Sequence, residues 1–249
     1  MFKIKNEFID KQEKTYNIRN INIKNPLEIS SILGEYITLS SPENENDFEI
    51  NEDGIYLFKS KYDTTKAIRL YKDYNSYKYT NHNDYIIIDE LQKRQNNIKL
   101  TKFPTGIITI ENKVIGQEIP YYENNETILN YFTNGNMKKR PTQFYLEILK
   151  ILKELCNEGI YYTDIHTKNF LINNVNEVIN LIDFEKNFIY LDNQRNFAYS
   201  SMINNLKFYL INILNRVSDI KLNESYEKAE TLEEIEEIVK EKDNKLQFR

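Results

Sequence analysis

Apolar residues recur at helical spacing over a long stretch in the second half of the chain. Within residues 141–157 they stand at Phe144, Ile148, Ile151, Leu152 and Leu155. Residues three and four positions apart share one face of an α-helix, so this spacing predicts a helix with one apolar face turned to the core. Gly159 follows, and we expect the helix to end there because glycine readily adopts the left-handed conformation that closes helices.

Similar patterns predict further helices. They lie at residues 84–95, 126–132 and 200–214, together with a short helix that begins at Asn25-Pro26 and ends at Gly34. The last helix is predicted to begin at Thr231, because Glu234 three positions later completes a capping-box pattern. Its apolar face consists of Leu232, Ile235, Ile238 and Val239.

Short β-patterns dominate the first half of the chain. Apolar runs predict strands at residues 48–50, 55–58, 66–71, 106–110 and 114–119. The turn at residues 52–54 joins the first two strands into a hairpin. A second hairpin is predicted where residues 170–172 and 178–182 flank a polar turn. Strands followed mainly by helices predict an α+β fold.

Three polar residues flank the second hairpin. Asp164 and Asn169 stand five positions apart just before its first strand, and Asp183 directly follows its second strand. A carboxylate can accept or orient the proton of an attacking hydroxyl, and carboxylate and amide oxygens are suitable ligands for Mg²⁺. Asn169 and Asp183 stand at the ends of the hairpin strands, so we expect both side chains to face one cleft.

The stretch from Gly159 to Glu185 resembles the active site of the protein-kinase-like superfamily. Asp164 and Asn169 match the ends of the family's H-R-D-x-x-x-x-N loop, and Asp183 begins a segment similar to D-F-G. The resemblance implies that Asp164 is the catalytic base. It also implies that Asn169 and Asp183 hold Mg²⁺ against the phosphates of ATP.

The wider resemblance covers roughly residues 48–215. It implies a two-lobed protein-kinase-like fold with a β-rich N-lobe and a shortened helical C-lobe. On this alignment, residues 1–35 form an N-terminal extension, residues 36–120 the small lobe and residues 121–249 the large lobe.

The resemblance also implies which residues cover the adenine and which reach the phosphates. The stretch from Ala67 to Arg69 is similar to the family's V-A-I-K strand, and period-two alternation puts these two residues on one face. Ala67 would cover the adenine, and Arg69 would reach the phosphates in place of the usual lysine. Gly54 is what is left of the glycine-rich phosphate loop. His166 would contact the γ-phosphate.

The adenine is expected to lie against further residues that the alignment identifies. Leu171 would form the floor of the base site, and Ile119 would form its back. Pro120 has no N–H group, so the backbone donor to the base edge is either Tyr121 or Tyr122.

The chain departs from the family pattern at several points. It has no G-x-G-x-x-G and no A-P-E, and about fifteen residues separate Asp183 from the next predicted helix. The helical acid that would pair with Arg69 is left open between Asp84 and Glu90. His166 stands where protein kinases usually have lysine and where many aminoglycoside and choline kinases have histidine in a D-x-H-x-x-N loop.

Composition limits the partners and the compartment. A net charge of −5 argues against nucleic acid or an anionic membrane as the main partner. The single cysteine, Cys156, lies in an apolar helical pattern, which favours a core position and a reducing compartment. No stretch is apolar enough to span a membrane and the start lacks a secretory profile, so we expect a cytoplasmic protein, with a codon usage typical of bacteria or phages. His82 is expected in a solvated turn.

We therefore predict an ATP- and Mg²⁺-dependent phosphotransferase that transfers the γ-phosphoryl group to a hydroxyl, with a Ser or Thr of an unknown protein as the expected acceptor. Three alternatives are open. One is a pseudokinase that serves as a binding module, which the missing glycines and the arginine at position 69 favour. The second is a small-molecule kinase, favoured by His166 and the short segment after Asp183. The third is transfer of the nucleotidyl group.

Overall fold

The computed structural model describes residues 19–23, 36–38, 55–60, 62–71, 82–110, 113–134, 139–184, 189–192, 195–217, 222 and 225–247. The chain divides into two compact units. Unit 1 comprises residues 1–96 and 102–123, and unit 2 comprises residues 97–101 and 124–249. The described residues contain both helices and sheets, so the expected α+β composition is confirmed.

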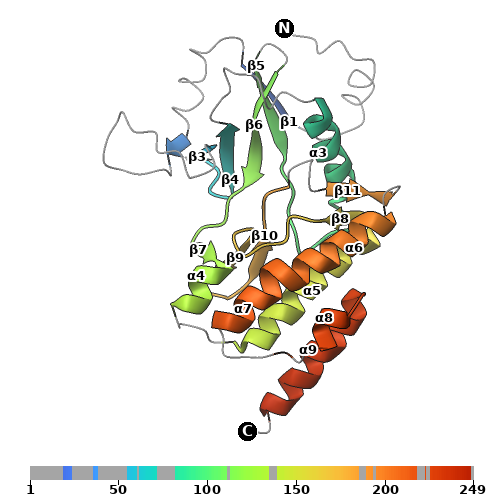
Figure 1. Cartoon of the computed structure of the whole chain (residues 1–249). Coiled ribbons are helices and arrows are strands. Elements are labelled where there is room, and N and C mark those ends of the chain that lie inside the picture. The colour runs from blue at the N-terminus through green and yellow to red at the C-terminus, as the bar shows by residue number, and fades with distance from the viewer. Residues whose placement is uncertain are drawn as a thin grey trace. The chain divides into compact units, whose positions relative to one another are not determined.

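A six-stranded sheet forms the frame of unit 1 (Figure 1). Its strands are β1 (Arg19–Ile23), β2 (Tyr36–Thr38), β3 (Ile55–Ser60), β4 (Lys66–Tyr71), β5 (Gly106–Ile110) and β6 (Lys113–Pro120). Their order is β1-β5-β6-β4-β3-β2, and every neighbouring pair is antiparallel except β1 with β5. The four strands predicted within residues 55–119 are confirmed, whereas residues 48–50 lie outside the described residues.

The turn between β3 and β4 is built from its own polar side chains. The Ser60 hydroxyl accepts hydrogen bonds from the N–H groups of Tyr62 and Asp63, at 3.2 and 3.1 Å. The Asp63 carboxylate in turn accepts from the N–H and the hydroxyl of Thr65, at 3.0 and 2.6 Å. Such side-chain to backbone bonds replace missing backbone pairs and define tight turns.

Helix α3 (His82–Arg94) completes the described part of unit 1. Its apolar residues Ile88 and Leu91 are buried, as the predicted stripe required. Its first residue is His82, so the turn expected there is wrong, while the side chain of His82 lies outside the described residues. Near its end, the Gln92 amide donates to the carbonyls of Phe103 and Pro104, which fixes the helix to the segment leading into β5.

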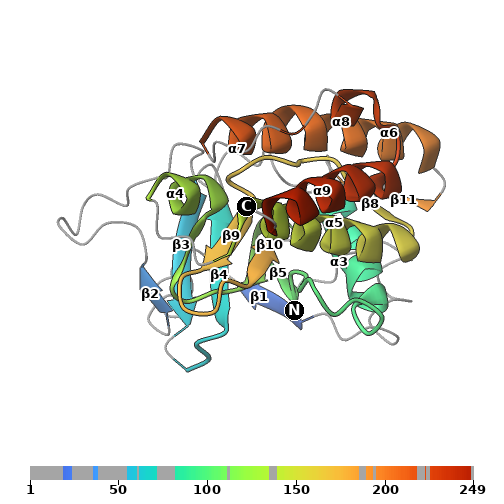
Figure 2. The ribbon, with the colours of Figure 1, turned by 90° about the horizontal axis from the view of Figure 1, so that it is seen from below.

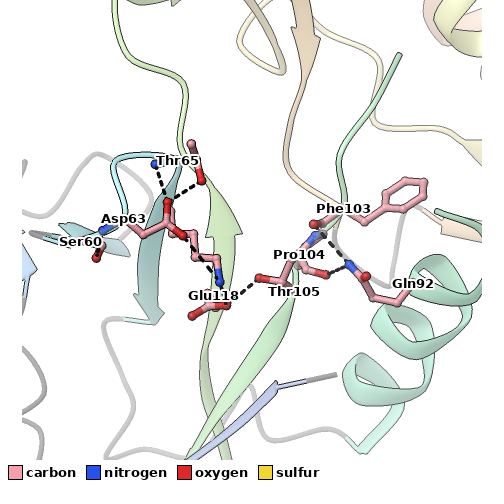
Figure 3. A network of polar contacts seen from close by, with 9 residues as sticks. Ser60, Asp63, Thr65, Gln92, Phe103, Pro104, Thr105 and Glu118 are labelled. Carbon is pink, nitrogen blue, oxygen red and sulfur yellow. Dashed lines mark hydrogen bonds and ion pairs between the residues drawn. The ribbon is translucent and has the colours of Figure 1, made fainter. Parts of the chain in front are cut away.

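A buried carboxylate connects the strands of unit 1 (Figure 3). Glu118 on β6 is fully buried and accepts a hydrogen bond from the Thr105 hydroxyl at 2.7 Å. The Lys66 ammonium lies 3.3 Å from the same carboxylate oxygen. A buried charge is tolerated when it is paired and hydrogen-bonded in this way.

Unit 2 combines short strands with longer helices. Its strands are β7 (Asn125–Thr127), β8 (Ile160–Tyr162), β9 (Phe170–Asn173), β10 (Ile179–Leu181) and β11 (Ile189–Leu191). They form a sheet of order β10-β9-β7 and a two-stranded sheet of β11 with β8. Its helices are α4 (Ile128–Thr133), α5 (Pro141–Asn157), α6 (Arg195–Asn205), the π-helix η3 (Leu206–Ile211), α7 (Asn212–Val217), α8 (Ser225–Lys228) and α9 (Leu232–Gln247).

Helix α5 is the centre of the core of unit 2. The five apolar residues that predicted it are all buried, and Gly159 follows it with a positive φ of 68°, as expected for a helix-closing glycine. Helix α9 packs along α5 (Figure 2). Polar contacts secure this packing, because the Asp243 carboxylate binds the Arg140 guanidinium at 2.9 Å and also accepts from the Thr142 hydroxyl.

The predicted helix boundaries are wrong in two places. Residues 125–127 form strand β7, so the helix expected from Glu126 begins only at Ile128. The single helix expected over residues 200–214 spans residues 195–217 and is interrupted by the π-helical segment. No helix in the described part of the chain is both long enough and apolar enough to cross a membrane.

A short segment between α3 and β5 belongs to unit 2. The N–H groups of Lys99 and Leu100 both donate to the Glu154 carboxylate on α5, each at 2.8 Å. Ile98 is buried beside them, and the Asn97 amide donates to Glu158 at 2.9 Å. The chain therefore leaves unit 1, contributes five residues to unit 2 and returns.

Candidate active site

The loop between β8 and β9 carries the predicted catalytic residues of unit 2. Its inward-facing residues Thr163, Ile165 and Thr167 are buried, while Asp164 and His166 between them are partly exposed. Strands β8 and β9 hold the two ends of the loop through their pairing with β11 and β10. The alternation of buried and partly exposed positions therefore brings the side chains of Asp164 and His166 to the surface of the loop.

Asn169 is bound directly to Asp164. Its side-chain amide nitrogen lies 2.8 Å from Asp164 Oδ2, 3.0 Å from the Asp164 carbonyl and 2.7 Å from the Tyr162 hydroxyl. Asn169 is itself buried, so these contacts fix its orientation. All three use the amide nitrogen, which leaves the amide oxygen as the atom suited to a cation.

His166 lies next to the same carboxylate. Its Nε2 is 3.5 Å from Asp164 Oδ1, and its Nδ1 accepts a hydrogen bond from the Lys168 N–H at 3.2 Å. Because Nδ1 acts as an acceptor, the proton of the neutral imidazole belongs on Nε2, which faces Asp164. The backbone therefore selects the tautomer that directs an N–H group toward the predicted base.

Asp183 has a backbone conformation that is unusual for its residue type. Its φ is 66°, in the left-handed region, where non-glycine residues are uncommon and are concentrated at functional sites. The neighbouring Ile182 N–H donates to the Asn169 carbonyl at 2.9 Å. Phe184 on the other side is buried, which holds the backbone of Asp183 between two fixed residues.

Tyr162 connects the two loops, and the sequence analysis missed it. The Tyr162 oxygen accepts from the Asn169 amide, and its one O–H proton is shared between the carbonyls of Ile182 and Asp183, at 3.1 and 3.2 Å. Its ring packs against the Phe184 ring with centroids 5.4 Å apart. The only signal in the sequence is a tyrosine at the end of a buried strand, two positions before Asp164.

The donor set fits a hard divalent cation. Asp164, Asn169 and Asp183 offer two carboxylates and one amide oxygen, the ligand types that Mg²⁺ takes alongside phosphate and water. Among the described residues, no group of three or more His, Cys, Asp and Glu side chains could hold a metal ion.

The predicted nucleotide residues divide between the units. Ala67 and Ile119 are paired across β4 and β6 in unit 1, and Ala67 is fully buried. Arg69 lies two positions further along β4, opposite Gln117, and is half-buried. Leu171 lies in unit 2, on β9 between β7 and β10. Gly54 and the turn around it lie outside the described residues.

The segment after β6 carries the two expected backbone donors to the adenine, the N–H groups of Tyr121 and Tyr122. The Tyr121 N–H donates to the Thr65 carbonyl at 2.8 Å, so this group is already engaged within unit 1. Tyr122 is the other candidate, and burial raises the pKa of its phenol to about 12.

Lys59 is a cation on β3 that the sequence analysis did not identify. It lies directly opposite Ala67 in the pairing of β3 with β4. Its ammonium is 2.6 Å from the Glu123 carboxylate and 4.9 Å from the centre of the Tyr121 ring. Its hydrogen bond with Glu123 raises the pKa of Lys59. Cross-strand pairing, which the sequence does not show directly, brings it there.

Helix α3 carries a third acid, Asp89, besides the two candidates Asp84 and Glu90. Glu90 forms ion pairs within the helix, with Lys93 and with Arg94 at 3.8 Å. Asp89 is fully buried, with the Lys93 ammonium 3.2 Å from its carboxylate. Burial raises the pKa of Asp89. The side chain of Asp84 lies outside the described residues.

The comparison with solved structures finds chains that are similar to this one. No protein-family model and no curated protein matches the chain. A solved structure, the Cydia pomonella granulovirus kinase PK-1, is similar to the chain with a TM-score of 0.43 and 12% identity. The similarity covers 66% of this chain and 56% of the viral kinase. The chain thus spans little more than half the length of that protein.

Proposed function

We propose that the chain is a protein-kinase-like phosphotransferase that binds ATP and Mg²⁺ and transfers the γ-phosphoryl group to a hydroxyl. The observation that carries the proposal is the hydrogen-bonded cluster of Asp164, Asn169 and Tyr162, joined through Tyr162 to the carbonyl of Asp183. In this proposal unit 1 is the small lobe and unit 2 the large lobe of a two-lobed kinase-like fold.

Each residue has a distinct role in the proposed reaction. Asp164 accepts or orients the proton of the acceptor hydroxyl, and the contact with Asn169 holds its carboxylate in place. The Asn169 amide oxygen and the Asp183 carboxylate hold the cation, which supplies charge neutralisation at the phosphates when it is bound. His166 directs its Nε2 proton toward the site and donates to the γ-phosphate.

Unit 1 supplies the nucleotide-binding residues in this proposal. Ala67 and Ile119 contact the adenine, and the Tyr122 N–H is the donor to its edge because the Tyr121 N–H is bound to Thr65. Arg69 binds the phosphates and Leu171 of unit 2 contacts the base. Arginine can bind phosphate through a planar fork, although its geometry differs from that of the lysine usual in the family.

The proposal is tested by incubating the purified chain with ATP, Mg²⁺ and a mixture of generic protein substrates, and by measuring ADP release and phosphate incorporation. We expect turnover that requires Mg²⁺ and is lost in Asp164→Asn. Matched samples of Val175→Ala, an exposed position on the β9–β10 turn, should retain wild-type turnover. Absence of both nucleotide binding and turnover would contradict the proposal, whereas binding without turnover would favour a pseudokinase.

A small-molecule acceptor is the second candidate. The specific observation in its favour is His166, whose imidazole lies 3.5 Å from the Asp164 carboxylate at the position where antibiotic and choline kinases carry histidine. A panel of aminoglycosides and amino alcohols, assayed for ADP release, would separate this acceptor class from a protein acceptor. Mass spectrometry of the products would distinguish phosphoryl from nucleotidyl transfer.

A further inference from the structure

The helix that follows the candidate site changes its winding part-way along. Helix α6 ends at Asn205, the π-helical segment η3 covers residues 206–211, and α7 continues from Asn212. The Asn212 N–H donates to the Lys207 carbonyl five positions earlier, the bond that defines a π-turn. Segments of this kind are rare and occur frequently at functional sites.

The spacing of buried residues explains why the helix widens here. A buried row runs through Ala198, Met202, Leu206 and Leu210, each four positions after the last. An α-helix has about 3.6 residues per turn, so a row spaced by four drifts about 40° around the helix at each step. A wider π-turn counteracts this drift and keeps the row facing the core.

The residue at the start of the π-turn holds the candidate catalytic loop. The Asn205 side-chain amide donates to the Thr163 carbonyl at 2.6 Å. Thr163 is buried and directly precedes Asp164. The contact therefore fixes the backbone from which the proposed base projects.

The residues beyond the π-turn are anchored as well. Asn212 accepts a hydrogen bond from the Tyr226 hydroxyl, and Asn215 accepts one from the Tyr145 hydroxyl at 3.1 Å. Within the turn, the Lys207 ammonium binds the carbonyls of Glu227 and Ala229 at 2.9 and 2.8 Å. The rotation of the helix before and after the turn is thus fixed by separate contacts.

We propose that the π-turn is a positioning element for Asp164, an inference that rests on the proposed function. The turn sets the rotation between the anchored α7 and the end of α6, so that Asn205 can reach the Thr163 carbonyl. Asn205 is then a positioning residue that acts on Asp164 through the backbone. An uninterrupted α-helix anchored at Asn212 and Asn215 would turn the Asn205 amide away from the loop.

The first test replaces the donor. In Asn205→Asp the carboxylate cannot donate to the Thr163 carbonyl and repels it. We expect kcat to fall about tenfold or more while the KM for ATP changes little, because the nucleotide-binding residues are untouched. Asn204→Asp is the matched control, since Asn204 is the exposed preceding residue of the same helix and receives the same charge. This control should keep the wild-type kcat.

The second test adds a residue to the turn. Phe208 is 64% exposed within the π-segment, so an alanine inserted after it displaces no core side chain at that point. The π-turn already accommodates one extra residue, so the insertion should rotate α6 relative to α7 by about 100° and lower kcat as Asn205→Asp does. The substitution Phe208→Ala keeps the chain length and should leave kcat unchanged. A wild-type kcat in the insertion variant would overturn the role of the turn, and if that variant does not fold, the comparison of the two asparagine variants decides.

Hydrogen exchange separates this inference from the proposed function. Backbone amides of residues 163–169 should exchange faster in Asn205→Asp than in Asn204→Asp. In an active wild-type chain, an unchanged kcat in Asn205→Asp would overturn the positioning role and leave the proposed function standing. If the wild-type chain shows no turnover, the proposed function fails. Equal hydrogen exchange of residues 163–169 in Asn205→Asp and Asn204→Asp would then separately overturn the positioning role.

Discussion

The loops of unit 2 and the sheet of unit 1 contribute to the proposed activity in different ways. In unit 2, Asn169 and the segment at Ile182 and Asp183 lie within about twenty positions of one another and are joined by hydrogen bonds of 2.7–3.2 Å through Tyr162. In unit 1, Ala67, Ile119 and Lys59 come from three strands and are brought together by sheet pairing alone. The residues of unit 2 are close in sequence, so a motif can identify them. Those of unit 1 are brought together by the register of paired strands, which a motif does not show.

The largest effect is expected from a substitution of Asp183, the acid whose φ lies in the left-handed region. Asp183→Asn removes the charge while keeping a residue type that tolerates a positive φ. We expect turnover to fall at least about a hundredfold, since the loss of one group that stabilises transition-state charge has an effect of that size. The measurement is ADP release at saturating ATP and Mg²⁺, with circular dichroism as the control for folding. Wild-type activity in this variant would end the claim that unit 2 carries the chemistry.

The second prediction concerns the residue that joins the two loops. Tyr162→Phe removes the donor shared by two part-buried carbonyls, so we expect a loss of about 1 kcal/mol in the free energy of unfolding. We also expect kcat to fall about tenfold, because Asn169 loses one of its fixed contacts. Urea unfolding and steady-state kinetics measure the two effects.

Tyr209→Phe is the matched control for that variant, since Tyr209 is an exposed tyrosine of the same unit. It should change neither quantity. A Tyr162→Phe variant with normal stability and normal kcat would show that the two loops are held together without the hydroxyl.

The third prediction compares the two cations of unit 1. Arg69→Met should raise the KM for ATP about tenfold, because a charge-assisted bond to phosphate is typically worth 1.5–3 kcal/mol. Lys59→Met should have a smaller effect, because the proposal assigns the phosphates to Arg69 on β4, and Lys59 lies on the neighbouring strand β3. ATP titrations of both variants measure the difference. A larger effect at Lys59 would identify the cation of β3, and not that of β4, as the one that meets the nucleotide.

The smallest effects are expected from Asp89 and Asp63, two acids of unit 1 whose pKa values are shifted in opposite directions from the ordinary value. Burial raises the pKa of Asp89, so the folded state binds its proton more tightly than the unfolded state and loses stability as the pH rises above the ordinary aspartate range. Asp89→Asn should therefore gain stability relative to wild type as the pH rises through that raised pKa.

The hydrogen bonds from Thr65 lower the pKa of Asp63, so its contribution has the opposite sign. It is present above the unfolded pKa and is lost as the pH falls through the lower folded value. Asp63→Asn should therefore be less stable than wild type near neutral pH and approach it in acid. Urea unfolding at a series of pH values measures both variants. If the stabilities of Asp89→Asn and Asp63→Asn, each relative to wild type, changed in the same direction with pH, the opposite pKa shifts assigned to Asp89 and Asp63 would be contradicted.

Most of the architecture follows from local patterns in the sequence. The buried stripe of α5, the helix-closing Gly159 and the hairpin of β9 and β10 were predicted because each depends on residues within a few turns of one another. The proximity of Asp164 to Asn169 was predicted for the same reason, and the structure gives a contact of 2.8 Å. The roles assigned to these residues are still predictions.

The features that escaped prediction depend on distant parts of the chain. Lys59 meets Tyr121 only because β3 pairs with β4 and the segment after β6 returns to Thr65. The π-turn arises from a small excess in the spacing of buried residues, which is difficult to distinguish from ordinary helical spacing over so short a stretch. Strand β7 was taken for helix because three polar residues carry little pattern.

The five residues that unit 2 receives from the loop after α3 limit how the chain can be divided. A fragment that starts at residue 124 would lack the backbone N–H groups of Lys99 and Leu100 that satisfy Glu154, and would expose the surface that Ile98 covers. Cutting between the units therefore damages the larger of them. Recombinant expression of unit 2 alone requires residues 97–101 to be supplied as well, for example as a fused peptide ahead of residue 124.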